Sequence, residues 1–244
     1  MDKTTMVGNQ ETSYPEESEE PLHRSLFGND CFRVFCAVIP PGAETLYHRH
    51  SHDSLVVVVE GGDQATSVRG PSRTDRFVFP GPAGVFRKLR AGIEGLLRGS
   101  MRFRSGEFFA TLYRGHPIVH KVAASRKNAD ALRLMDIQLL AHRPAPIEGE
   151  STAARNARKR IEVPRFVVYT AKLNPGAAPL SFRATTPSLV VSLDGGLALA
   201  GGTLRDDVPA ELGKGQFRSV QCGERLELGC ASRAVSSALI LALR

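Results

Sequence analysis

Three histidines alternate within one short segment of this chain, PGAETLYHRHSHDSLVVVVEGG, and their spacing suits metal binding. His48, His50 and His52 occupy every second position. Side chains at positions i and i+2 of a strand leave the same face, so the rings of His48 and His50 can converge on one ion. A further histidine from a neighbouring strand would complete a ligand face and leave open positions for substrate or water. The spacing therefore predicts a metal site; the alternative is a surface strand that carries two histidines.

The same segment resembles the first motif of the cupin superfamily. In that motif a glycine is followed at fixed spacing by His-x-His, usually a glutamate, and a second glycine. Gly42, His48, His50 and Gly61 match this pattern, and Ser54 stands at the position of the glutamate. The resemblance implies small antiparallel β-barrels and a metal centre, and it leaves the chemistry open because one fold serves many activities.

The second cupin motif normally supplies one more histidine, and its nearest match here is GEFFATLYRGHPIVHKVAAS. The resemblance implies His120 as the third metal ligand, with His116 as the competing candidate. Because Ser54 removes the usual carboxylate, the predicted site is a neutral three-histidine face that leaves a divalent cation a stronger Lewis acid. The resemblance favours Fe²⁺, and imidazole ligands also suit Zn, Mn, Ni or Cu.

Two further side chains of the first motif are candidates for catalysis. His52 continues the alternation of the two predicted ligands, and Ser54 follows on the strand expected to face the metal. Either side chain would lie close enough to move a proton or to hydrogen-bond a substrate. The alternatives for His52 are a metal ligand and a residue exposed to solvent.

The chain contains an internal repeat. Residues 32–62 align without a gap to residues 166–196, FVVYTAKLNPGAAPLSFRATTPSLVVSLDGG, with 14 of 31 positions identical. Both copies predict a strand, a proline-glycine turn, a second strand and a glycine turn, and a strand-rich block follows each. The expected fold is therefore all-β, with two cupin-type antiparallel β-barrels (a bicupin) that arose by internal duplication.

The second copy lacks every histidine of the first. Phe182, Ala184 and Thr186 stand at the three histidine positions, and residues 215–244 contain no histidine. We therefore expect the second barrel to be degenerate and metal-free. Its expected role is to bury a face of the first barrel or to build a homodimer.

Composition divides the chain into four parts. Residues 1–24 are rich in glutamate and poor in apolar side chains, which predicts a disordered acidic tail. Residues 25–141 would form the N-terminal barrel, and residues 165–244 the degenerate C-terminal one. Residues 142–164, rich in proline, alanine and charge, are the predicted linker.

The formal net charge of +7 is concentrated in one region. Residues 69–104 hold nine basic and two acidic side chains, mostly within an insertion at about 70–95 that the second copy lacks. Apolar residues of VFRKLRAGIEGLL recur at helical spacing, which predicts a short helix over one barrel end. A basic lid that attracts an anionic substrate and a membrane-docking surface are the alternatives. No interleaved aromatics accompany these arginines, so nucleic-acid binding is not expected.

The remaining features favour a cytoplasmic protein. The first residues lack the apolar stretch of a secretory signal, no run is long enough to cross a bilayer, and the four cysteines form no paired motif. No membrane partner is expected. The function that the resemblance favours is a mononuclear iron dioxygenase acting on a small chelating molecule, with an anionic one suited to the basic insertion. The alternatives are a metal-dependent isomerase, cyclase or lyase without redox chemistry, and a non-catalytic small-ligand-binding module.

Overall fold

The chain is almost entirely β-structure. The computed structural model describes residues 13–69, 76–81, 101–140, 157–201 and 210–244. Within these ranges every element is a β-strand except the 3₁₀ turn η1 (Glu17–Glu19). The strands of every sheet pair antiparallel. No helix in the described ranges is long and apolar enough to span a membrane.

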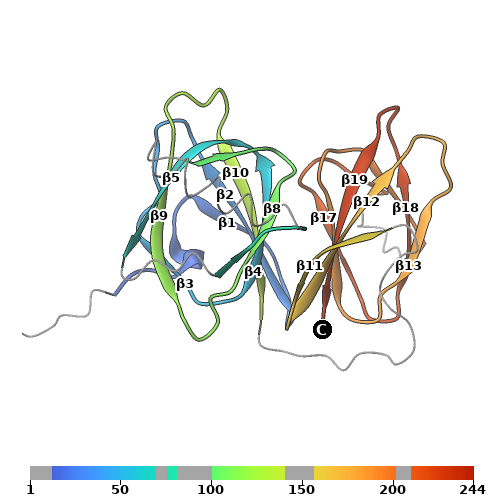
Figure 1. Ribbon diagram of the computed structural model, residues 1–244, viewed down its shortest axis with the longest axis horizontal. Coiled ribbons are helices and arrows are strands. Elements are labelled where there is room, and N and C mark those ends of the chain that lie inside the picture. Colours follow the sequence, from blue (N-terminus) through green and yellow to red (C-terminus); the bar gives the residue numbers. More distant parts are fainter. Residues whose placement is uncertain (1–12, 70–75, 82–100, 141–156, 202–209) are drawn as a thin grey trace, which may run out of the picture.

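Two sheets make up the N-terminal half, on the left of Figure 1. The six-stranded sheet has the order β1 (His23–Gly28), β2 (Phe32–Ile39), β10 (Leu132–Leu139), β4 (Ser54–Glu60), β8 (Phe108–Thr111), β6 (Phe77–Val78). The four-stranded sheet has the order β3 (His48–His50), β9 (Ile118–Ala124), β5 (Gly62–Arg69), β7 (Met101–Phe103).

Two further sheets form the C-terminal half, on the right of Figure 1. The five-stranded sheet has the order β11 (Arg158–Val163), β12 (Phe166–Leu173), β19 (Ser236–Leu243), β14 (Ser188–Ser192), β17 (Phe217–Val220). The four-stranded sheet has the order β13 (Leu180–Arg183), β18 (Arg225–Cys230), β15 (Leu197–Ala200), β16 (Glu211–Leu212).

The two halves repeat one topology, as the internal duplication predicts. In sheet order, β1-β2-β10-β4-β8 corresponds to β11-β12-β19-β14-β17, and β3-β9-β5-β7 corresponds to β13-β18-β15-β16. The register is repeated as well, because Phe32 pairs with Leu139 and its equivalent Phe166 pairs with Leu243. The short strand β6 lies within the insertion of the first copy and has no counterpart in the described part of the second.

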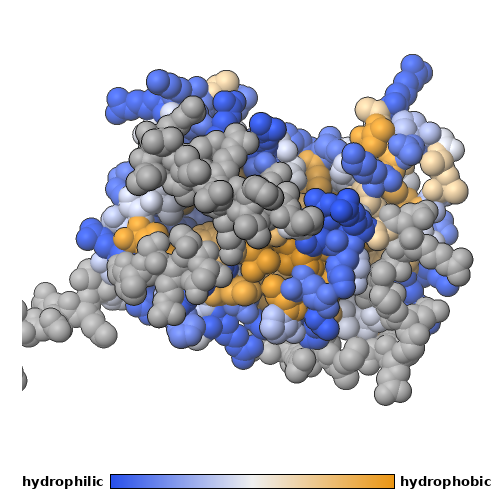
Figure 2. Space-filling view, in the orientation of Figure 1, coloured by the Kyte–Doolittle hydropathy of each residue, from blue (hydrophilic) through white to orange (hydrophobic). Residues whose placement is uncertain are grey.

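An apolar core joins the halves. Leu55 and Val57 of β4 pack in one buried cluster with Leu189 and Val191 of β14, which are their equivalents in the second copy. Val56 of the same strand points to the opposite side, into the interior of the N-terminal half. Because both faces of β4 are buried, its sequence is a continuous valine run and not an alternating pattern. Figure 2 shows hydrophobic residues gathered near the centre of the visible face, around this junction.

The observed boundaries differ from the sequence prediction in two places. Residues 13–24, expected to be disordered, form η1 and the start of β1, with Glu17 1% and Glu20 2% exposed. These glutamates are ordered because histidines of the N-terminal half pair with them, which composition does not reveal. Residues 158–163, expected in the linker, form β11 beside β12.

Two predicted segments fall mainly outside the described residues. Most of the linker belongs to 141–156, and most of the basic insertion, including its predicted helix, belongs to 70–75 and 82–100. The short strand β6 is the described part of that insertion.

Candidate metal centre

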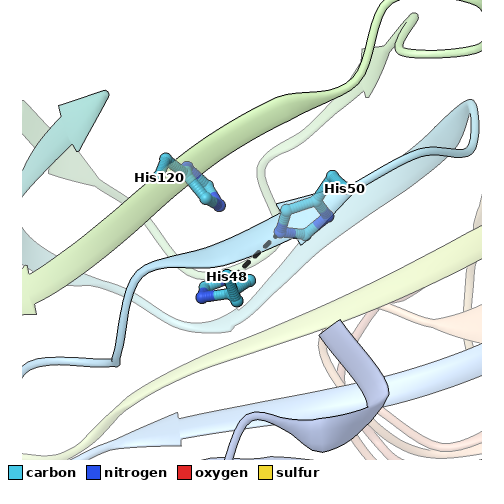
Figure 3. A group of neighbouring side chains, drawn as sticks. All are labelled: His48, His50 and His120. Atoms are coloured by element: carbon cyan, nitrogen blue, oxygen red, sulfur yellow. Dashed lines mark hydrogen bonds between the residues drawn. The ribbon is translucent and has the colours of Figure 1, made fainter. Parts of the chain in front are cut away.

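Strands β3 and β9 bring the three predicted ligands together. β3 carries His48 and His50, and its pairing with β9 sets His120 directly opposite His48. The ring centroids are between 4.7 and 4.9 Å apart. Figure 3 shows His48 and His50 on one strand and His120 facing them from the next. Of the two candidates for the third ligand, the geometry therefore supports His120.

The Nε2 atoms of His48 and His50 face each other across 3.0 Å. Each ring is fixed from its other side, because His48 Nδ1 lies 2.8 Å from the Leu46 carbonyl oxygen and His50 Nδ1 lies 2.9 Å from a Glu17 carboxylate oxygen. Metal-ligating histidines usually use their second nitrogen in this way. Two nitrogens about 2.1 Å from one ion, at right angles to each other, are about 3.0 Å apart, so the observed separation suits two ligands of one ion.

The Nε2 atom of His120 is buried, and it has no hydrogen-bond partner in the described structure. Leaving such a nitrogen unsatisfied costs roughly 1–3 kcal/mol, so its position beside two other histidines indicates a ligand site. The ligand atoms of His48, His50 and His120 lie within 4.8 Å of one another. This donor set fits a divalent metal ion held on a three-histidine face.

The surroundings set the protonation of these histidines. Burial, together with the charge of His50, lowers the pKa of His48 to about 4, and burial holds the pKa of His120 well below its usual range. Burial alone would lower the pKa of His50, but the charge and hydrogen bond of Glu17 outweigh it and raise this pKa to about 9. In the metal-free protein at neutral pH, His50 is therefore charged and donates its Nε2 proton to His48.

Two buried carboxylates stand behind His50, and sequence reasoning missed both. Glu17 lies 2.9 Å and Asp136 of β10 lies 3.5 Å from His50 Nδ1. Burial, together with the charge of Glu17, raises the pKa of Asp136 well above its usual range. For Glu17 burial also acts to raise the pKa, but the charge of His50 prevails and lowers it to about 2. The candidate ligand face still consists of three histidines, and the sequence did not reveal the negative charge that lies on the outer side of one of them.

A fourth histidine, His23 of β1, adjoins the cluster. Its ring centroid lies 4.7 Å from that of His48, and its Nδ1 lies 2.8 Å from a Glu20 carboxylate oxygen. Sequence reasoning missed His23 because it stands in the glutamate-rich segment and has no fixed spacing from the His-x-His pair. The pairing of β1 with β2, which sets His23 opposite Ala37, is what brings it here.

The four histidines line a cavity of about 250 Å³ inside the N-terminal half. Its wall is largely apolar and partly aromatic, with Phe77, Phe103 and Phe109 among the lining residues. The polar residues of the wall include Gln64, whose Oε1 is buried without a hydrogen-bond partner in the described structure, and Tyr113. Burial raises the pKa of Tyr113, so its hydroxyl stays protonated at neutral pH. The described lining contains no lysine or arginine.

The two predicted catalytic residues do not belong to this wall. Ser54 is buried, and its hydroxyl lies 2.7 Å from the hydroxyl of Thr111, which does line the cavity. Burial of His52, together with the charges of Arg33 and Arg165, lowers the pKa of its ring. Neither His52 nor Ser54 is therefore among the described residues that line the cavity, and their catalytic roles stay predictions.

His116 lies away from the metal centre. It lines a separate groove of about 490 Å³, together with Arg76, Arg114 and Arg165. Its backbone carbonyl oxygen accepts a hydrogen bond from the Arg76 guanidinium. The groove has arginine donors and no further histidine in its described lining, so it does not share the chemistry of the cavity.

Apolar side chains fill the equivalent positions of the C-terminal half. Phe182 pairs with Leu226 in the way that the two facing histidines of β3 and β9 pair. Both are buried in one cluster with Ala184 and with Ile240, which stands at the position of Asp136. Carbon chains therefore replace the nitrogen and oxygen donors at these four positions.

Comparison with known proteins gives matches among solved structures. No family model matches the sequence, and no curated protein matches it at the required significance. A cupin 2 conserved barrel domain protein from Leptotrichia buccalis matches with a TM-score of 0.52 and 13% identity, over 94% of this chain and 91% of that one. A bacterial pirin from Escherichia coli in complex with nickel(II) matches with a TM-score of 0.54 and 14% identity, over 90% of this chain and 89% of that one. A mutant of the salicylate 1,2-dioxygenase from Pseudoaminobacter salicylatoxidans matches with a TM-score of 0.53 and 12% identity, over 90% and 76%.

Each likeness covers at least 90% of this chain and so extends over both halves. At such low identities a likeness shows the fold and leaves the activity open. The strand order of each half and these matches agree with the resemblance found in the first histidine motif. This chain therefore has the fold of the cupin superfamily, built twice from one duplicated unit.

Proposed function

We propose that this protein is a metal-dependent dioxygenase that binds one Fe²⁺ ion per chain and acts on a small chelating substrate. One observation carries the proposal: three histidine nitrogens, one of them buried and unpartnered, converge on the wall of an apolar cavity. His48, His50 and His120 would hold the ion. When bound, Fe²⁺ supplies a Lewis acid for a chelating substrate and a redox centre for dioxygen.

The cavity wall would bind the substrate and exclude water. Phe103 and Phe109 stack with their ring centroids 5.4 Å apart, and Val56 and Leu134 extend the apolar surface. Exclusion of water strengthens the polar interactions that remain inside. Gln64 offers an acceptor oxygen to a hydroxyl or amine of the substrate. The best-fitting substrate is therefore small and mostly apolar, with two neighbouring oxygen or sulfur atoms that chelate.

The lining of the cavity narrows the kinds of anionic substrate that we expect. The described part of the wall offers no cationic side chain to pair with a negative group. A negative charge on the chelating atoms would be balanced by the metal ion, so an enolate, phenolate or thiolate suits the cavity better than a distant carboxylate.

Oxygen consumption tests the proposal. The iron-loaded protein is assayed with small thiols, diketones and phenolic acids, and His120→Leu serves as the variant without a complete ligand face. We expect oxygen uptake that depends on both substrate and iron and that is lost in the variant. Turnover at the same rate without oxygen would overturn the dioxygenase and leave the isomerase or lyase. Substrate binding without any turnover would leave the non-catalytic module.

A further inference from the structure

The cupin pattern places a carboxylate at position 54, where this chain has a serine. A carboxylate from another segment nevertheless contacts one of the candidate ligands. Glu17 reaches His50 from an N-terminal segment that crosses the site, residues 13–24, which we call the strap. We propose that Glu17 takes over the charge of the missing glutamate as a positioning residue, which orients His50 and thereby sets the affinity for the metal. This inference rests on the proposed metal-binding function.

The strap is held over the site by contacts with β3 and the residues before it. The Arg49 amide donates to the Pro15 carbonyl oxygen at 2.8 Å, beside a parallel bridge between Glu16 and Arg49. The Leu46 amide donates to a Glu20 carboxylate oxygen at 3.1 Å. The strap therefore follows the strand that carries two of the ligands, and its position is coupled to theirs.

The run EESEE gives the strap two inward and two outward carboxylates. In a 3₁₀ turn, side chains at i and i+3 lie one above the other. Glu17 and Glu20 are accordingly both buried, while Glu16 and Glu19 are exposed. Each inward carboxylate pairs with a histidine of the cluster, Glu17 with His50 and Glu20 with His23. The composition of this glutamate-rich run predicts disorder, but the three-residue spacing of Glu17 and Glu20 places both carboxylates against histidines of the cluster.

The environment of Glu17 suits a functional role better than a stabilising one. One carboxylate oxygen accepts hydrogen bonds from His50 and from the Gln138 side chain, while the other is buried without a partner. Burying a charged pair is costly, and such a pair contributes little net stability compared with apolar packing. A carboxylate on the second nitrogen of a ligating histidine fixes the ring and makes it a stronger ligand. The contact is therefore best explained by its effect on His50.

Metal titration of matched variants tests the inference. Glu17→Gln keeps the size of the side chain and removes its charge, and Glu19→Gln makes the same change at an exposed position of the same turn. With nickel(II) as the probe, we expect Glu17→Gln to raise the Kd about 10- to 100-fold, the usual effect of losing such a partner, and Glu19→Gln to leave it unchanged. An unchanged Kd in Glu17→Gln would overturn the inference.

A second readout on the metal-free protein does not depend on metal binding. We expect a slowly exchanging Nδ1–H resonance of His50 in the NMR spectrum of the wild type, shifted or lost in Glu17→Gln and retained in Glu19→Gln. A purely structural role would lower the melting temperature of Glu17→Gln and leave the nickel(II) Kd of the folded protein unchanged, which would contradict the inference. Wild-type protein that shows the resonance but binds no nickel(II) would instead overturn the proposed function. Wild type without the resonance would contradict the positioning contact itself.

Discussion

A histidine ring has two nitrogens, and the neighbours of each decide what the residue can do. His48 and His50 commit Nδ1 to a fixed oxygen and so keep Nε2 for the cavity. His120 brings an unpaired, buried Nε2 to the same place. His23 instead pairs its Nδ1 with Glu20 and stands beside the ligand face. Hydrogen bonding alone does not separate His23 from His50, because each pairs its Nδ1 with a glutamate. The distances do, because the ligand atoms of His48, His50 and His120 lie within 4.8 Å of one another and His23 does not belong to this group.

Two substitutions separate the roles of individual ligands in the metal-free protein. His120→Leu removes an unsatisfied nitrogen and copies Leu226 of the second half, so we expect stability to rise by about 1–3 kcal/mol. His50→Leu leaves the Glu17 carboxylate buried without its positive partner and with only the Gln138 side chain as a hydrogen-bond donor, so we expect the free energy of unfolding to fall by about 3 kcal/mol or more. Urea unfolding of both variants measures the difference. Equal losses would show that His120 is not an unsatisfied group.

Local patterns in the sequence were enough to predict the three histidines that the structure brings together. His48 and His50 follow from strand alternation, and His120 follows from the resemblance of its segment to a second motif. Glu17, His23 and Asp136 have no local signature, because the folded chain brings them together from separate elements. Ser54 shows the same limit. The sequence reveals a serine at the position of the usual glutamate, but it does not reveal that carboxylates from other elements lie near the site.

At the scale of elements, a strand's sequence reports how many of its faces are buried. The valine run of β4 predicts a strand, and the structure explains why the run is continuous: both faces of the strand meet apolar neighbours. The sequence RKRIEV of β11 was assigned to a linker, because this strand buries only Ile161 and Val163 and exposes charge at the edge of its sheet. Charged edge strands protect a sheet from further pairing, and they resemble loops in composition.

The strap is the element whose removal should matter most to the site. Deleting residues 1–24 removes His23 together with Glu20 and leaves His50 without Glu17, so we expect the free energy of unfolding to fall by about 2–4 kcal/mol and metal binding to weaken. Thermal unfolding and metal titration measure the two effects. Deleting residues 1–12 alone is the control that assigns the effect to the strap. An unchanged melting temperature after the longer deletion would show that residues 13–24 do not stabilise the fold, and it would contradict this prediction.

At the scale of the whole molecule, the duplicated unit packs against its own copy. Equivalent residues of β4 and β14 share one core, and Lys214 lies 2.8 Å from Glu60 across the junction. The C-terminal half has apolar side chains at the positions that match the candidate ligands, and it covers a face of the N-terminal half. We therefore expect the two halves to unfold together in one transition.

Glycine substitutions test this junction. Gly215 has φ +70°, and a Cβ there would lie 2.4 Å from the Val59 side chain of the other half. Gly176 has a similar φ of +72° in open space, so Gly176→Ala should cost only the backbone penalty of about 1–2 kcal/mol. Gly215→Ala should cost a further 1–3 kcal/mol, roughly, from overpacking. Equal costs in urea unfolding would mean that the halves do not meet closely at this point.

Metal content is the measurement that tests the central claim most directly. The protein is purified without added metal and analysed by mass spectrometry of its metals, beside His120→Leu and the matched variant His116→Leu. Three histidines of the N-terminal half should hold one ion per chain, chiefly iron, which His120→Leu loses and His116→Leu keeps. No ion in the wild type, two ions per chain, or an ion retained in His120→Leu would contradict the account.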